Sequence, residues 1–197
     1  MLLICGMGNK HIYFFAVALI YAASVSAQFK KIDTTAKLGD AGYRVSCNNK
    51  KDDENSLSIS PVGFKGARPI YFNIKGKVSK IIVDDLNDDG YPDLLVLIYT
   101  GANNEIGNVV GITSNQNTDI MPVFFPDIYN DPKLREGYKG HDEFAVVVGT
   151  LLRTFPIYKP GDTDTPSGGK RVVQYKIDKG ENGRLTFKML RTYEKQE

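Results

Sequence analysis

The sequence predicts an all-β protein, a single-domain antiparallel β-sandwich or a barrel-like sheet. Short segments rich in β-branched and aromatic residues recur at regular spacing, and clusters of glycine, proline, asparagine and aspartate separate them. No window carries a capped amphipathic helical stripe. The stretch 127–140 has room for a single helical turn, because Pro132 and two glycines interrupt it.

The first 27 residues have the layout of a secretory signal peptide. Lys10 and His11 precede an apolar run from Ile12 to about Ala23, and the small residues that end at Ala27 form an A-x-A-like cleavage site. The apolar run is shorter than the roughly 20 residues that a membrane-spanning helix requires. We therefore expect an exported protein, periplasmic or secreted, with no membrane span once residues 1–27 are removed.

Residues 28–55 are polar and end in the charged run NNKKDDEN. We expect a flexible lead-in here, followed by one edge strand near Tyr43 to Cys47. The β-domain is expected to cover residues 56–197.

From residue 56 onward the chain is a series of predicted strands. SLSIS alternates strictly between apolar and polar residues, whereas DLLVLIYTG is a continuous apolar run, long enough for a strand buried on both faces. The glycines of DKGENG suit a hairpin turn. The expected strands cover 56–60, 69–76, 77–85, 93–101, 108–113, 120–125, 142–148, 150–158, 170–177 and 184–193.

Charge and cysteine content exclude several classes of protein. Removal of Lys10 with the signal peptide leaves 24 basic and 23 acidic side chains, so we expect no nucleic-acid partner. Cys47 is then the only cysteine, and stability has to come from core packing without an internal disulfide. Its thiol is either buried or available for pairing between chains, and a homodimer is left open.

The residues do not indicate an enzyme. His141, in GHDEF, is the only histidine after residue 27, and one histidine with one cysteine cannot build a structural zinc site. No G-x-S-x-G-like nucleophile turn accompanies it. We expect His141 and Asp142 to form local hydrogen bonds that fix the start of the strand that follows them.

The stretch DLNDDGYPD, residues 85–93, places oxygen atoms at a spacing that suits Ca²⁺, and Gly90 permits a sharp turn. It is not an EF-hand, because Val96 stands where the bidentate acid would be. Either Ca²⁺ pins this turn, or the Asp and Asn side chains satisfy its backbone groups by themselves. Both alternatives stay open, and both give the loop a structural role. The candidate ligands are the side chains of Asp85, Asn87, Asp89 and Asp93 and the carbonyl of Tyr91.

One longer stretch is more specific. GYKGHDEFAVVVGTLLRTFPIYKPGDTDTPSGGKRVVQYKI, residues 137–177, resembles the periplasmic inhibitors of invertebrate-type lysozyme, in which GYxGHDEFAVV precedes an R-x-FPVY-like strand, a GD…PTGG loop and a Q-Y-K strand. VDDLNDDGYPDLLVLIYTG, residues 83–101, matches an upstream D-L-N-x-D-G turn and a strand that ends near Ser-Gly. The resemblance spans roughly residues 70–190.

This resemblance implies an all-β protein that inserts a protruding loop into the active-site cleft of a lysozyme. The corresponding segment here is TGANNEIGN, residues 100–108, in which Ile106 stands where the family has tyrosine. A lysozyme cleft works with two carboxyl groups, so hydroxyl and amide donors suit it, whereas Glu105 would be repelled if it pointed inward. The implied inhibitory residues are Thr100, Gly101, Asn103, Asn104, Ile106 and Gly107.

The long polar loop 161–169 is expected either to be a plain connection between strands or to form a second contact patch beside residues 100–108, with Arg153 or Lys170 supplying charge. The alternative function is a calcium-stabilised secreted β-module that binds a carbohydrate or another protein.

Overall fold

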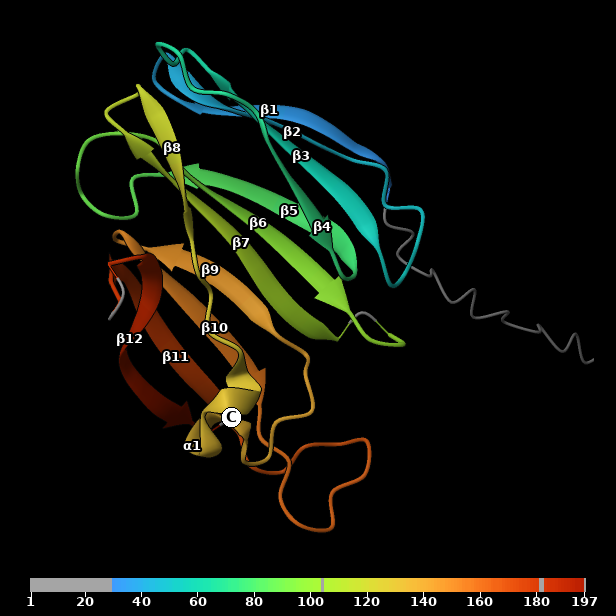
Figure 1. Ribbon diagram of the computed structural model, residues 1–197. Helices are drawn as coiled ribbons and strands as arrows, with labels where there is room; N and C mark the ends of the chain where they lie inside the picture. Colours follow the sequence, from blue (N-terminus) through green and yellow to red (C-terminus); the bar gives the residue numbers. More distant parts are fainter. Residues whose placement is uncertain (1–29, 104, 181–182, 197) are drawn as a thin grey trace, which may run out of the picture.

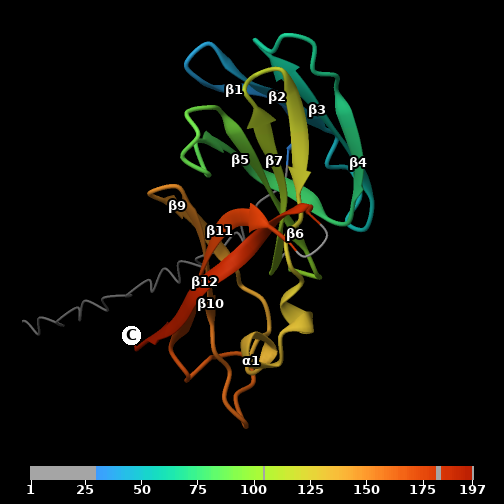
Figure 2. The same cartoon turned by 60° about the vertical axis from the view of Figure 1, so that its left-hand side comes forward.

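The computed structural model describes residues 30–103, 105–180 and 183–196. In this part of the chain twelve strands form three four-stranded antiparallel sheets, which confirms the predicted all-β fold (Figure 1). The sheets are stacked, and Figure 2 shows the middle sheet between the other two. The expected signal peptide, residues 1–27, lies outside the described residues. No helix in the described ranges has the length and apolar character needed to cross a membrane.

The first sheet, which we name sheet A, has the strand order β1-β2-β3-β4. Its strands are β1 (Ile32–Leu38), β2 (Ala41–Cys47), β3 (Asn55–Val62) and β4 (Ile70–Ile74). This corrects the expectation for residues 28–55, because they do not form a flexible lead-in with one edge strand. β2 is an interior strand that pairs with both β1 and β3, and β1 is the edge strand.

Sheet B is the middle layer, with the order β5-β6-β7-β8. Its strands are β5 (Lys77–Asp84), β6 (Asp93–Thr100), β7 (Ile106–Asn115) and β8 (Asp119–Val123). Each strand pairs with its sequence neighbour, so the sheet is a meander of short hairpins. The loop 85–93 joins β5 to β6, and the segment 101–105 joins β6 to β7.

Sheet C has the order β12-β11-β10-β9. Its strands are β9 (Glu143–Val147), β10 (Thr150–Pro156), β11 (Lys170–Lys179) and β12 (Leu185–Lys195). Between sheets B and C the chain forms a 3-10 turn, η1 (Ile128–Asn130), and one short helix, α1 (Pro132–Arg135). The side chains of Asp127 and Asp131 cap these two turns by accepting hydrogen bonds from backbone amides. The helical content thus lies within the stretch where the sequence left room for one turn.

Two hydrophobic cores lie on opposite faces of sheet B, and β6 contributes to both. Leu94, Val96 and Ile98 pack toward sheet A, whereas Leu95 and Leu97 pack toward sheet C. Successive side chains of a strand point to opposite faces, so a strand between two cores has to be apolar at every position. The prediction that this segment is buried on both faces is confirmed, since all residues from Asp93 to Ile98 are buried.

The end of β8 ties sheet B to sheet C. The amide of Phe124 donates to the carbonyl of Leu185, and the amide of Phe187 donates to the carbonyl of Phe124. β8 consequently pairs with β7 only from Gly111 to Asn115, and then it turns away toward β12.

Cys47 lies in the core between sheets A and B. Its thiol donates to the Oδ1 atom of Asn49 at 3.1 Å, and burial raises the pKa of the thiol. The thiol is therefore buried, the first of the two alternatives that the sequence left open, and in the folded protein it is not accessible for pairing between chains.

Candidate functional site

The tip of the β6–β7 hairpin projects at one end of sheet B (Figure 1). Gly101, Ala102 and Asn103 are exposed, and Thr100 is half-buried at the end of β6. Asn104 lies outside the described residues. Gly101 has a φ angle of +94°, a backbone conformation that glycine adopts readily and other residues do not. The exposed part of the expected inhibitory segment is therefore its first half.

The second half of that segment is held inside the protein. Ile106 is half-buried and Gly107 is buried. The amide of Gly107 donates to Oδ2 of Asp142 at 2.7 Å. A Cβ atom at Gly107 would lie 2.5 Å from the ring of Phe144, so this position has room only for glycine. Gly107 therefore belongs to the base of the hairpin and is not presented to a partner.

Glu105 joins the tip to its base. Its carbonyl accepts hydrogen bonds from the amides of His141 and Asp142, at 2.5 and 3.3 Å. Its side chain turns back over the tip, where Oε2 accepts from the amide of Asn103 at 2.7 Å. The carboxylate therefore serves the turn and does not project beyond it, which reduces the repulsion that the sequence led us to expect.

A buried ion pair between Asp142 and Arg153 lies beneath this base. Their side chains are 0% and 2% exposed, and two bonds join them, from Nε to Oδ1 at 2.7 Å and from Nη2 to Oδ2 at 3.0 Å. The hydroxyl of Tyr138 donates to Asp142 and accepts from Arg153 at 2.8 Å. Burial favours a lower pKa for Arg153, but the hydrogen bond and the charge of Asp142 outweigh it and raise this pKa, so the guanidinium stays charged.

The prediction that Arg153 belongs to a second contact patch with Lys170 is wrong, because the side chain of Arg153 is buried. On β10, Leu151, Arg153 and Phe155 occupy alternate, inward-facing positions, and the guanidinium carbon lies 5.2–5.9 Å from the centres of four aromatic rings. A buried arginine of this kind has no access to a partner. Lys170 is half-buried at the start of β11, opposite Pro156, so the structure does not assemble the two residues into one patch.

The loop 85–93 closes through hydrogen bonds of its own side chains. The carboxylate of Asp85 accepts from the amides of Asp89 and Gly90, and that of Asp89 accepts from the amide of Tyr91 and from the side-chain amide of Asn87. Asp and Asn side chains commonly bond to backbone amides in this way and so close turns without a metal ion.

Asp93, the last residue of this loop, is fully buried at the start of β6. It accepts hydrogen bonds from the amides of Leu86, at 2.9 Å, and Ser114, at 3.1 Å. Burial raises the pKa of Asp93 to about 7; the two amide bonds act against this rise, and nearby carboxylates add to it. Among the described residues, no group of three or more His, Cys, Asp or Glu side chains is arranged to hold a metal ion. The calcium site stays a prediction.

The loop 85–93 and the hairpin tip lie at opposite ends of β6 (Figure 1). The strand runs from Asp93 to Thr100, and a rise of about 3.3 Å per residue separates its ends by roughly 23 Å. The two candidate sites are therefore physically separate.

The fold and the site together define an all-β protein that presents a short hairpin tip on a base fixed by buried charges. The sequence matches no protein-family model and no curated protein. The resemblance to lysozyme inhibitors therefore depends on the motifs in residues 83–101 and 137–177.

The buried role of Arg153 was not predicted, although the sequence carries a signal for it. Leu151 and Phe155 flank it at alternate positions of a strand and both face a core, so Arg153 has to face the same core. A charge at such a position requires a partner, and GHDEF places an acid at the start of the neighbouring strand.

Proposed function

We propose that the protein is an exported inhibitor of a lysozyme-type glycosidase, of which the invertebrate type is the first candidate, and that the β6–β7 tip enters the active-site cleft. The observation that carries the proposal is an exposed tip on a fixed base. Gly101 and Asn103 are exposed, whereas Gly107 is bound to Asp142. A binding loop that is already ordered loses less conformational entropy on association.

The chemistry of the tip supports this proposal. Two carboxyl groups flank the scissile bond in a lysozyme cleft, so a blocking segment should donate hydrogen bonds. Thr100 contributes a hydroxyl group and Asn103 a side-chain amide, and Asn104 would add a second amide. The only carboxylate among the described residues of the tip is that of Glu105, and it accepts a hydrogen bond from the backbone amide of Asn103, which leaves the side-chain amide of Asn103 available.

The test is the clearing of a bacterial cell-wall suspension by invertebrate-, chicken- and goose-type lysozymes, with and without an excess of residues 28–197. We expect the invertebrate-type enzyme to be slowed. If none of the three enzymes is slowed at micromolar concentrations of the protein, the proposal fails.

Two variants with the same chemical change locate the contact. Asn103→Asp places a negative charge at the tip, facing the carboxyl groups of the enzyme, and should weaken inhibition by about tenfold or more. Asn73→Asp makes the same change at an exposed position of β4, in sheet A, and should inhibit like the unaltered protein. Equal inhibition by both variants would place the contact elsewhere.

We also propose export with cleavage after Ala27. Expression in a bacterial host with a periplasm, followed by intact-mass measurement of the periplasmic fraction, should give a chain that begins at Gln28. A chain that keeps residues 1–27 and stays in the cytoplasm would contradict this part of the proposal.

A further inference from the structure

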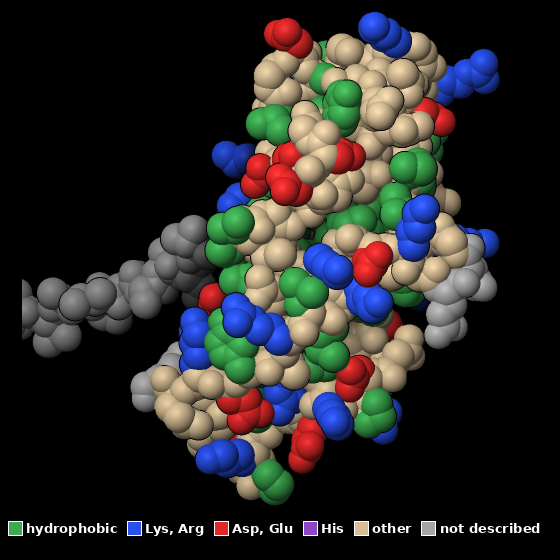
Figure 3. All heavy atoms as spheres, turned by 90° about the vertical axis from the view of Figure 1, so that its left-hand side faces the viewer, with side chains coloured by type: hydrophobic (Ala, Val, Ile, Leu, Met, Phe, Trp, Pro, Cys, Tyr) green, Lys and Arg blue, Asp and Glu red, His purple; other side chains and the backbone are tan. Residues whose placement is uncertain are grey.

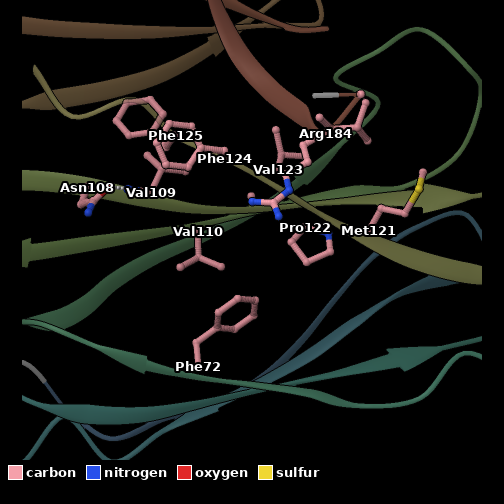
Figure 4. Close-up of a pocket in the computed structure, with 13 residues that line it drawn as sticks. Phe72, Asn108, Val109, Val110, Met121, Pro122, Val123, Phe124, Phe125 and Arg184 are labelled. Carbon is pink, nitrogen blue, oxygen red and sulfur yellow. Dashed lines mark hydrogen bonds between the residues drawn. The ribbon is translucent and has the colours of Figure 1, made fainter. Parts of the chain in front are cut away.

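A groove of about 650 Å³ lies where β8 turns away from β7 (Figure 4). All three sheets contribute to its walls: Phe72 comes from β4, Val110 and Pro122 come from sheet B, and Leu185 begins β12. In Figure 4, Phe72 and Val110 face each other across the groove. Its volume falls in the range of about 300–1,000 Å³ that is typical of small-molecule sites.

The walls of the groove expose apolar side chains to water. Phe124 is 62% exposed and Met121 is 39% exposed, and both line the groove. Figure 3 shows hydrophobic side chains at the waist of the molecule, with Lys and Arg side chains around them. Contiguous exposed apolar surface of this kind marks a binding site more often than isolated apolar residues do.

Arg184 adds a positive charge to this apolar surface. It follows the β11–β12 turn, and its side chain points into the groove toward Val110 and Pro122 (Figure 4). Within the described part of the chain, no hydrogen bond or ion pair engages its guanidinium group. A guanidinium above an apolar wall is suited to an anion that carries an apolar tail.

An extended peptide could not form a full set of backbone hydrogen bonds with the edge of β7 that faces the groove. The amide of Val109 donates to the side-chain Oδ1 of Asn108 at 2.7 Å, so a donor that strand addition would need is already used. This contact favours a small amphiphile over an extended peptide as the occupant.

We propose that this groove binds a single-chain carboxylate amphiphile of the fatty-acid class. The alkyl chain lies against Phe72, Val110 and Phe124, and the carboxylate pairs with Arg184. This site is separate from the hairpin tip, and the proposal does not depend on lysozyme inhibition.

The test uses residues 28–197 and the fluorescent probe 11-(dansylamino)undecanoic acid, whose emission rises in an apolar environment. We expect saturable binding and displacement of the probe by laurate. Across octanoate, decanoate and laurate, each added methylene should tighten binding by about twofold to fourfold. Absence of saturable probe binding would overturn the proposal.

Arg184→Gln tests the polar end of the site. It should weaken laurate binding by about threefold to fivefold and leave displacement by 1-dodecanol, which has no charge, unchanged. Arg135→Gln, at an exposed position of α1, is the matched control. If Arg184→Gln weakens the binding of laurate and of dodecanol equally, or weakens the binding of neither, the assigned role of Arg184 is wrong.

Met121→Glu tests the apolar wall of the groove. A carboxylate on this wall should weaken laurate binding by about tenfold or more, whereas Met189→Glu, at a similarly exposed position of β12, should not. Circular dichroism and melting midpoints establish that both variants fold. Sedimentation of the unliganded protein distinguishes another occupant, because a dimer that Met121→Glu dissociates would mean that a second copy fills the groove, and would overturn the proposal.

Discussion

The carboxylate of Asp142 and the guanidinium of Arg153 are joined by two hydrogen bonds at a site that almost no water reaches. Asp142 precedes β9 and Arg153 lies on β10, yet the same carboxylate also accepts the amide of Gly107 on β7. The pair therefore fastens the β6–β7 hairpin of sheet B to sheet C. Two charges can leave water at this depth because each finds its partners inside the protein.

We predict that Asp142→Asn lowers the free energy of unfolding by about 3–5 kcal/mol, because it leaves the charge of Arg153 buried and without its counter-ion. Tyr138→Phe removes only a hydroxyl from the same network and should cost about 1–2 kcal/mol. Urea denaturation followed by circular dichroism measures both. Asp164→Asn, at an exposed loop position, is the control and should leave the unfolding free energy unchanged. A loss below 1 kcal/mol for Asp142→Asn would contradict the prediction.

A second prediction concerns Asp93 and pH. Its pKa of about 7 in the folded protein lies above the ordinary value of 3.8, so between about pH 4 and pH 7 the folded protein keeps a proton that the unfolded chain has lost. The contribution of Asp93 to the unfolding free energy is therefore complete below pH 4. It decreases as the pH rises to 7, by at most about 1.4 kcal/mol per pH unit, and is constant above that.

The measurement compares the unaltered protein with Asp93→Asn between pH 4 and pH 8. The variant should be less stable at every pH, because an amide cannot accept from both Leu86 and Ser114. The informative quantity is the difference between the two stability curves, which should shrink from pH 4 to pH 7. Parallel curves would mean that Asp93 does not titrate in this range.

A third prediction concerns the β9–β10 turn. Val148 has a φ angle of 45° and is 95% exposed, and Gly149 follows with a φ angle of 65°. A two-residue hairpin turn with both φ angles positive suits Asn-Gly, whereas a β-branched residue is strained there. Val148→Asn should raise the free energy of unfolding by about 1 kcal/mol. Val147→Asn, one position earlier and within β9, has no such strain to relieve. A melting midpoint that rises equally for both variants would refute the explanation.

The fourth prediction concerns calcium at residues 85–93. An ion present at 100 times its Kd would add ~2.7 kcal/mol of stability. The carboxylates of Asp85 and Asp89 already bond to amides of the loop, and if these bonds close the loop by themselves, the melting midpoints in calcium and in chelator will be equal. Magnesium at the same ionic strength controls for salt. A rise with calcium alone that Asp89→Asn abolishes would favour the calcium-stabilised module, and lysis assays would then decide between that function and inhibition.

Much of the fold could be predicted from the sequence. The strands from β3 to β12 lie close to their expected ranges, because apolar alternation and turn residues mark them. β1 was missed, because every side chain from Ile32 to Leu38 is at least partly exposed. Its place in the sheet comes from backbone pairing with β2, which leaves no hydrophobic pattern to recognise.

The candidate site could be predicted only in part. The exposed tip at Gly101 and Asn103 follows from a glycine-containing polar segment between two strands. The burial of Gly107 and the pairing of Arg153 with Asp142 depend on how sheets B and C face each other, and local spacing carries no information about that contact. Asp142 was expected to bond locally, and it does accept from the hydroxyl of Tyr138, four residues away. Its bonds to Arg153 and Gly107, 11 and 35 residues away in the sequence, were not expected.

Because β6 is buried on both faces, sheet B needs both sheet A and sheet C to cover its apolar side chains. Removal of sheet A would leave a stripe of leucine, valine and isoleucine in water along the centre of the remaining protein. Neither sheet A nor sheet C can therefore be removed without exposing apolar side chains of sheet B to water. A shortened version of this chain should aggregate instead of folding. Any smaller protein derived from it has to keep all three sheets or replace the apolar face that the missing sheet had covered.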